Sequence, residues 1–87
     1  MTTPTIPTIH RNGTGFTTLR DEYATAYDAI QKAIDALATA TLNARDYYPQ
    51  GNHAYYQARD ERTLALARLR EAHTYVGEML MGICDQG

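Results

Sequence analysis

The chain has 87 residues, a formal net charge of −2 and 44% hydrophobic residues. This length allows a single domain with a small core, and the slight acidic excess excludes a general nucleic-acid binder, which would carry a basic surface. The lone cysteine, Cys84, excludes a disulfide within the monomer. The three histidines lack the spacing of metal ligands, so we expect neither a metal site nor a cofactor.

Residues 1–16 are predicted to form an extended arm that ends in a glycine turn, and the arm is expected either to be a disordered tail or to lie along another subunit. Pro4 and Pro7 favour extended backbone, and Gly13 and Gly15 interrupt any helix that follows. The arm lacks the basic and apolar segments of a secretory signal, and no apolar run approaches the ~18 residues of a membrane span. We therefore expect a cytoplasmic protein with no membrane partner.

A first helix is expected at about residues 18–42. Thr17 or Thr18 would cap it, which would place Asp21 and Glu22 in the first turn, where the helix dipole favours acidic side chains. Steps of three and four separate its apolar residues, as on one face of a helix. These residues are Leu19, Tyr23, Ala26, Tyr27, Ile30, Ala33, Ile34, Leu37 and Ala38.

A loop at about 43–51 and a second helix at about 52–82 complete the chain. Asn43 is expected to end the first helix in the left-handed conformation, Gly51 to supply a permissive turn, and Asn52 to cap the second helix. The apolar stripe of this helix comprises Tyr55, Ala58, Ala65, Leu66, Leu69, Ala72, Val76, Met79, Leu80 and Ile83. Arg62 falls on that stripe, so either its stem packs while its guanidinium reaches the rim, or it serves a partner.

The predicted fold is therefore all-α: a two-helix antiparallel hairpin over residues 17–87 with an extended N-terminal arm. Two helices cover only one side of each other, whereas Tyr23, Tyr27, Leu66 and Leu80 widen the apolar surface beyond a two-helix seam. We expect the hairpin to bury the remaining surface by forming an oligomeric helical bundle.

Nothing in the sequence indicates an enzyme. The chain has no nucleophile elbow, no Walker A loop and no zinc-protease motif, and Cys84 has no histidine close in sequence. We expect no catalytic residues.

One polar cluster lies in the segment "HRNGTG" and is called the turn cluster: His10, Arg11, Asn12 and Thr14. The glycines expose backbone amides, Arg11 adds a guanidinium, and a helix N-terminus follows, which together form a possible phosphate cradle. A flexible hinge that leads into the helix is the alternative interpretation.

A second polar cluster lies in "NARDYYPQG" and is called the loop cluster: Arg45, Tyr47, Tyr48 and Gln50. Its rings and its arginine can stack on and clamp a flat anionic ligand such as a nucleotide. Alternatively, some of Tyr47, Tyr48, Tyr55 and Tyr56 plug the end of the bundle. The two clusters lie at opposite ends of one hairpin, but an antiparallel oligomer would bring them together between subunits.

The segments "HRNGTG" and "NARDYYPQG" resemble those of a family of small proteins encoded by tailed phages and prophages, over roughly residues 9–75. The resemblance implies a phage setting. In size, expected oligomerisation and possible phosphate site, the chain is also similar to the phage sponges that sequester the cyclic nucleotides of bacterial immunity, a similarity of type without a shared motif.

The predicted function is thus that of a phage anti-defence protein that sequesters a nucleotide-like anion between subunits without catalysis. Its ligand-binding residues would be His10, Arg11, Asn12, Thr14, Arg45, Tyr47, Tyr48 and Gln50. The alternative is a helical protein-interaction module that inhibits a host defence protein complex, with Tyr47, Tyr48, Tyr55 and Tyr56 as its contact patch. A virion assembly protein is a third reading, which no residue specifically favours.

Overall fold

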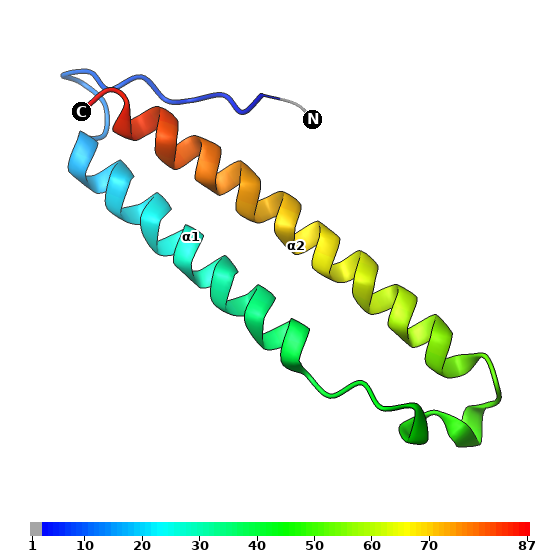
Figure 1. Cartoon of the computed structure of the whole chain (residues 1–87). Helices are drawn as coiled ribbons and strands as arrows, with labels where there is room; N and C mark the ends of the chain where they lie inside the picture. Colours follow the sequence, from blue (N-terminus) through cyan, green and yellow to red (C-terminus); the bar gives the residue numbers. More distant parts are fainter. Residues whose placement is uncertain (1–2) are drawn as a thin grey trace.

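The computed structural model describes residues 3–87 and contains two long antiparallel helices (Figure 1). Helix α1 spans Phe16–Thr39 and helix α2 spans Ala54–Cys84. Two single-turn 3₁₀ helices, η1 at Ala44–Asp46 and η2 at Tyr48–Gln50, form the connection. The molecule is a rod of 61 × 22 × 17 Å, and the described residues form no strand. The predicted helical hairpin is confirmed.

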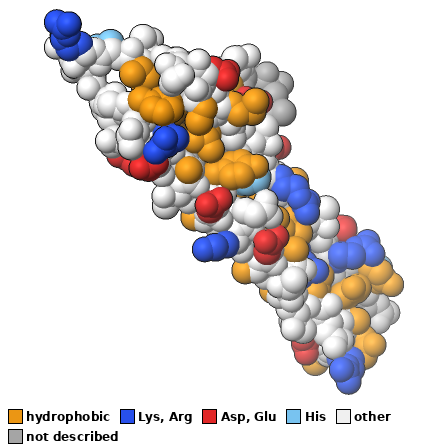
Figure 2. Space-filling view, turned by 60° about the vertical axis from the view of Figure 1, so that its left-hand side comes forward, with side chains coloured by type: hydrophobic (Ala, Val, Ile, Leu, Met, Phe, Trp, Pro, Cys, Tyr) orange, Lys and Arg blue, Asp and Glu red, His pale blue; other side chains and the backbone are white. Residues whose placement is uncertain are grey.

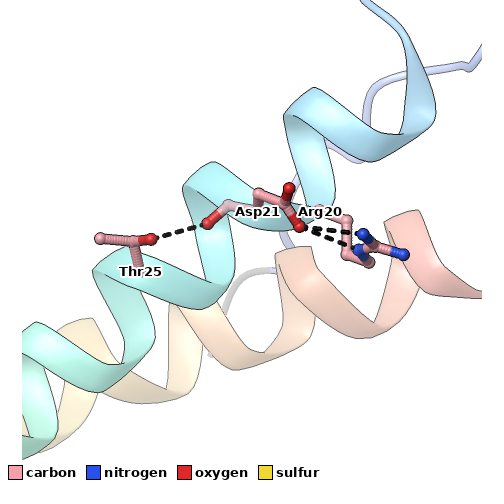
Figure 3. A network of polar contacts seen from close by, with 3 residues as sticks. All are labelled: Arg20, Asp21 and Thr25. Atoms are coloured by element: carbon pink, nitrogen blue, oxygen red, sulfur yellow. Dashed lines mark hydrogen bonds and ion pairs between the residues drawn. The ribbon is translucent and has the colours of Figure 1, made fainter.

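Helix α1 begins at Phe16, before both threonines that were expected to cap it. Gly15 is the N-cap, and no side chain caps this end, so the predicted threonine cap is wrong. The first turn consequently contains no acidic residue. Asp21 instead accepts from Arg20 at 3.0 Å, while its backbone carbonyl accepts from the Thr25 hydroxyl at 2.9 Å (Figure 3).

Helix α1 ends at Thr39, three residues earlier than expected, and a side chain from α2 closes it. The Arg62 guanidinium donates to the carbonyls of Leu37, at 3.3 Å, and of Ala40. The last carbonyls of a helix lack partners within the helix, and a cation there also complements the helix dipole. Neither of the two predictions for Arg62 describes this role, in which its guanidinium links α2 to the C-terminal end of α1 by hydrogen bonds.

The capping roles predicted for two asparagines are also wrong. Asn43 has φ −114° and ψ 130°, so it is extended and not left-handed. Helix α2 begins at Ala54 with His53 as its N-cap, which leaves Asn52 in the preceding turn. The permissive turn at Gly51 is confirmed by its φ of 112°, a value that favours glycine.

The core between the helices is thin. Its buried apolar side chains are Ile34, Val76, Met79 and Ile83, all members of the predicted stripes. Beside them, the Tyr27 ring stacks on the imidazole of His73, with centroids 3.9 Å apart. Gly77 makes room for this ring, because a Cβ there would lie 3.0 Å from Cε2 of Tyr27.

The arm lies along the C-terminal part of α2 (Figure 1). The Gln86 side chain donates to the carbonyl of Pro7 at 2.8 Å and accepts from the amide of Ile9 at 2.9 Å. Ile6 packs on Gly82, where a Cβ would come within 2.7 Å of the isoleucine side chain. Glycine normally weakens a helix, but at position 82 the absence of a side chain leaves room for the arm.

Large apolar side chains remain on the surface of the rod. Figure 2 shows apolar patches that recur along its length between charged side chains. The exposed examples are Tyr48, Tyr56, Leu64, Tyr75 and Met81. Within residues 3–87, neither helix contains an apolar stretch that could cross a membrane.

Candidate functional site: a tyrosine pocket at the bend of the hairpin

The bend of the hairpin encloses a pocket of about 300 Å³, here called the tyrosine pocket. Its lining consists of Ala44, Tyr47, Tyr48, Gly51, Asn52, Tyr55 and Tyr56. These residues come from η1, η2, the short segments that follow each of them, and the first turn of α2, so the fold of the connection determines the shape of the pocket. No charged side chain belongs to this lining.

Two local features shape the connection. The Asn43 side chain accepts from the amide of Arg45 at 3.0 Å and so caps η1. This bond explains why Asn43 does not end α1: its short polar side chain starts the next turn instead. At the other end, Gly51 turns the chain from η2 into α2, and an L-residue with a side chain would be strained at its φ of 112°.

The four rings of the pocket are not equally buried. Tyr47 and Tyr55 are half-buried and meet edge to face, with centroids 6.5 Å apart. Tyr55 also meets Tyr56 edge to face at 5.5 Å. Tyr48 and Tyr56 are 69% and 54% exposed, so these two rings have faces available for a ligand. Two rings therefore close the end of the hairpin, and two present apolar surface to solvent.

A cation lies against one of the four rings that line the tyrosine pocket. The Arg59 guanidinium lies 5.1 Å from the centroid of the Tyr56 ring, within the range of a cation–π contact. It also pairs with Asp60 at 3.5 Å, but both side chains are exposed, so solvent screens this pair and it adds little stability. The stacked guanidinium can donate to an anionic group of a molecule held in the pocket.

The turn cluster lies at the other end of the rod, where the arm enters α1 (Figure 1). The Gly13 amide donates to the carbonyl of His10 at 3.2 Å, which closes a tight turn. The imidazole of His10 lies over Gly13, because a Cβ there would fall 2.8 Å from Nε2 of the histidine. Arg11, Asn12 and Thr14 are exposed beside the start of α1. The turn therefore carries accessible donors near a helix N-terminus.

The predicted ligand-binding residues thus form two groups. Tyr47 and Tyr48 line the tyrosine pocket, whereas Arg45 and Gln50 lie on the same bend but do not line it. His10, Arg11, Asn12 and Thr14 belong to the opposite end of a rod 61 Å long. One chain therefore does not unite the two clusters in a single site.

Sequence reasoning omitted several pocket residues from the predicted ligand set. Tyr55 and Tyr56 are absent from that set, although they are predicted to plug the end of the bundle or to form a protein-contact patch, and Asn52 is predicted only as a cap. Arg59 is also absent from the predicted ligand set, although the three-residue step from Tyr56 to Arg59 indicates that the two side chains can meet on a helix.

Comparison with known proteins gives no match: no family model, no curated protein and no solved structure is significantly similar to this chain.

Proposed function

We propose that this protein is a non-catalytic binding protein whose tyrosine pocket holds the planar part of a nucleotide-like anion. The observation that carries the proposal is the pocket itself: four tyrosines surround about 300 Å³, and two of them expose their rings. Stacking on an aromatic face tolerates different bases, because every base has a π-face. A pocket built from rings therefore suits a nucleobase.

The anionic part of such a ligand requires donors outside the uncharged lining. Arg59, whose guanidinium lies over the Tyr56 ring, can supply one, and Arg45 lies on the same bend as the pocket. The turn cluster of a second copy supplies the remaining donors in this proposal. Arg11 would provide a guanidinium, and Thr14 and the glycine amides would provide further hydrogen bonds to phosphate.

The resemblance to small phage proteins suggests the biological setting of this binding. A protein that holds a cyclic nucleotide without altering it lowers the free concentration of that molecule. In a cell infected by a phage, such a protein would act against an immune response that depends on the messenger. We therefore propose an anti-defence sponge in the host cytoplasm.

A thermal-shift experiment tests the proposed ligand class. Binding to the folded state alone raises the melting temperature, by an amount that grows with ligand concentration. The probes are a panel of cyclic dinucleotides, cyclic trinucleotides and cyclic ADP-ribose species. At least one should raise the melting temperature and be recovered unaltered after heating. Absence of a shift across the panel would contradict the proposal, and recovery of a hydrolysed ligand would contradict its non-catalytic part.

The thermal shift of single-residue variants tests whether the ligand binds at the tyrosine pocket and the turn cluster. Tyr48→Ala removes the most exposed ring of the pocket and should abolish the shift, whereas Tyr48→Phe keeps the stacking face and should retain most of it. Arg11→Ala should also abolish the shift. Arg70→Ala is the matched control, because Arg70 is an exposed arginine of α2 that belongs to neither cluster. An equal loss in all variants would indicate binding elsewhere.

The exposed rings also favour a second candidate function, a protein-interaction module. Tyr48 and Tyr56 are large exposed aromatics next to an arginine, and tyrosine and arginine are enriched among interface hot spots. In this case no nucleotide would shift the melting temperature. A host defence protein would instead co-purify with the wild type and be lost with Tyr56→Ala.

A further inference from the structure

The rod exposes more surface than a compact protein of its mass. Its accessible surface is 6486 Å², whereas a compact folded monomer of 9.7 kDa exposes about 5,100 Å². The difference of roughly 1,400 Å² exceeds the ~800 Å² that each partner buries in a standard protein interface. The excess accessible surface of the chain is therefore large enough to form a stable interface with another protein.

One face of α2 carries a pattern that is complementary to itself. Leu64 and Tyr75 are 52% and 49% exposed, and the steps 64, 68, 71 and 75 place them on one helical face with Arg68 and Glu71. Arg68 and Glu71 are exposed, and within residues 3–87 neither forms an ion pair. The midpoint of Leu64 and Tyr75 and the midpoint of Arg68 and Glu71 coincide between residues 69 and 70.

This shared midpoint defines a two-fold pairing. If a second copy of α2 lies antiparallel across that point, Leu64 of each copy is level with Tyr75 of the other. Arg68 of each copy is level with Glu71 of the other, so the centre of the interface holds two charges of each sign. A two-fold interface requires such self-complementarity, because each copy contributes the same surface. A parallel pairing would place like residues together.

The same pairing brings the two polar clusters together. In this antiparallel pair, two residues on opposite sides of the midpoint and equally far from it in sequence lie at the same height along the helix axis. Tyr55 of one copy therefore lies at the height of Cys84 of the other. In each copy, the end of α2 carries the arm: Gln86 holds Pro7 and Ile9, and Gly87 lies against Phe16. The turn cluster between Ile9 and Phe16 therefore lies at the same end of the pair as the tyrosine pocket of the second copy.

We propose that the protein is an antiparallel two-fold dimer formed through the face of Leu64, Arg68, Glu71 and Tyr75. Each of its two ligand sites combines the tyrosine pocket of one copy with the turn cluster of the other. The ligand part of this inference rests on the proposed function, whereas the dimer does not. A nucleotide-like anion would then be stacked by one subunit and held at its phosphates by the second.

A charge-swap experiment tests the pairing with the full chain. Arg68→Glu leaves only acidic charges at the centre of the interface, and Glu71→Arg leaves only basic ones. Each variant alone should dissociate, with a dimer Kd raised by roughly tenfold or more, because like charges then face each other. An equimolar mixture of the two variants should form a heterodimer, in which both opposed pairs have opposite signs again.

Sedimentation velocity and native mass spectrometry report the assembly, and circular dichroism confirms that each variant is folded. Arg70→Glu introduces the same charge change outside this face and should leave the dimer intact. A monomeric wild type, single variants that remain dimeric, or a mixture that stays monomeric would each overturn the proposed interface. An intact dimer that no cyclic nucleotide stabilises would instead overturn the proposed ligand and leave the interface standing.

Discussion

The Tyr27 ring lies flat on the imidazole of His73, with centroids 3.9 Å apart and planes inclined by 24°. This stack joins α1 to α2 near the centre of the hairpin, close to the buried side chain of Val76. The stack leaves one polar atom of the imidazole without a hydrogen bond. Nε2 of His73 is buried, and within the described chain it has no hydrogen-bond partner.

Because Nε2 of His73 is buried without a partner, we expect that replacing the imidazole will not lower the stability of the protein. His73→Phe keeps a flat ring against Tyr27 and eliminates a buried polar atom, whose desolvation costs about 1–3 kcal/mol when it is unpaired. We expect the variant to be at least as stable as the wild type, with a free energy of unfolding equal or about 1 kcal/mol higher. Urea denaturation measures this difference. A loss of stability beyond about 1 kcal/mol would show that the imidazole has a partner.

Gly77 gives a second prediction about the same stack. Alanine normally favours a helix over glycine by about 1 kcal/mol. At this position its Cβ would lie 3.0 Å from Tyr27, whose ring is restrained by His73. We expect Gly77→Ala to lower the melting temperature in the wild type. In a Tyr27→Ala background the same change should raise it, and a rise in both backgrounds would contradict this packing.

The packing of the arm on α2 requires the absence of a side chain at Gly82, as the packing of Tyr27 does at Gly77. A Cβ at Gly82 would come within 2.7 Å of Ile6, so Gly82→Ala should displace the arm from α2. The amide of Ile9, which donates to Gln86, should then exchange with deuterium faster. Gly15→Ala is the matched control, because a Cβ there meets no atom within 4 Å. Unchanged exchange at Ile9 in Gly82→Ala would show that the arm is held independently of this contact.

Replacing Arg62 should lower the free energy of unfolding and leave the tyrosine pocket unchanged. Arg62→Met keeps an apolar stem but removes the donors to Leu37 and Ala40. Hydrogen bonds from charged groups contribute about 1.5–3 kcal/mol, so the free energy of unfolding should fall by about that amount. Arg70→Met, at an exposed position, should change it by less than about 0.5 kcal/mol. Equal effects in urea denaturation would show that the cap contributes nothing.

The sequence predicted the helices well because their periodicity is local and repeated. Steps of three and four identified both stripes, and all four buried apolar side chains of the described residues belong to them. The ends of the helices were predicted less well, because several polar residues compete for each cap. Gly15 precedes the threonines at the start of α1, and Asn43 caps η1 instead of ending α1.

Contacts between distant parts of the chain were not predictable in this way. Gln86 holds an arm nearly eighty residues earlier, and Arg62 reaches the end of the other helix. Neither contact leaves a periodic signal. For the candidate site, the bend rich in tyrosine and arginine coincides with the tyrosine pocket. The pocket depends on η1, η2 and the turn at Gly51, and its lining includes Tyr55 and Tyr56 but not Arg45 or Gln50.

Cys84 allows the most direct measurement of the proposed shared site, because it is the only cysteine and it is exposed. A spin label on Cys84 of the otherwise unchanged protein reports the distance between two copies by pulsed electron paramagnetic resonance. Antiparallel pairing about the midpoint of residues 69 and 70 separates the two labels by roughly 45 Å, given the helical rise of 1.5 Å per residue. A distance below roughly 20 Å, as in a parallel pair, or the absence of any dipolar coupling would contradict the account.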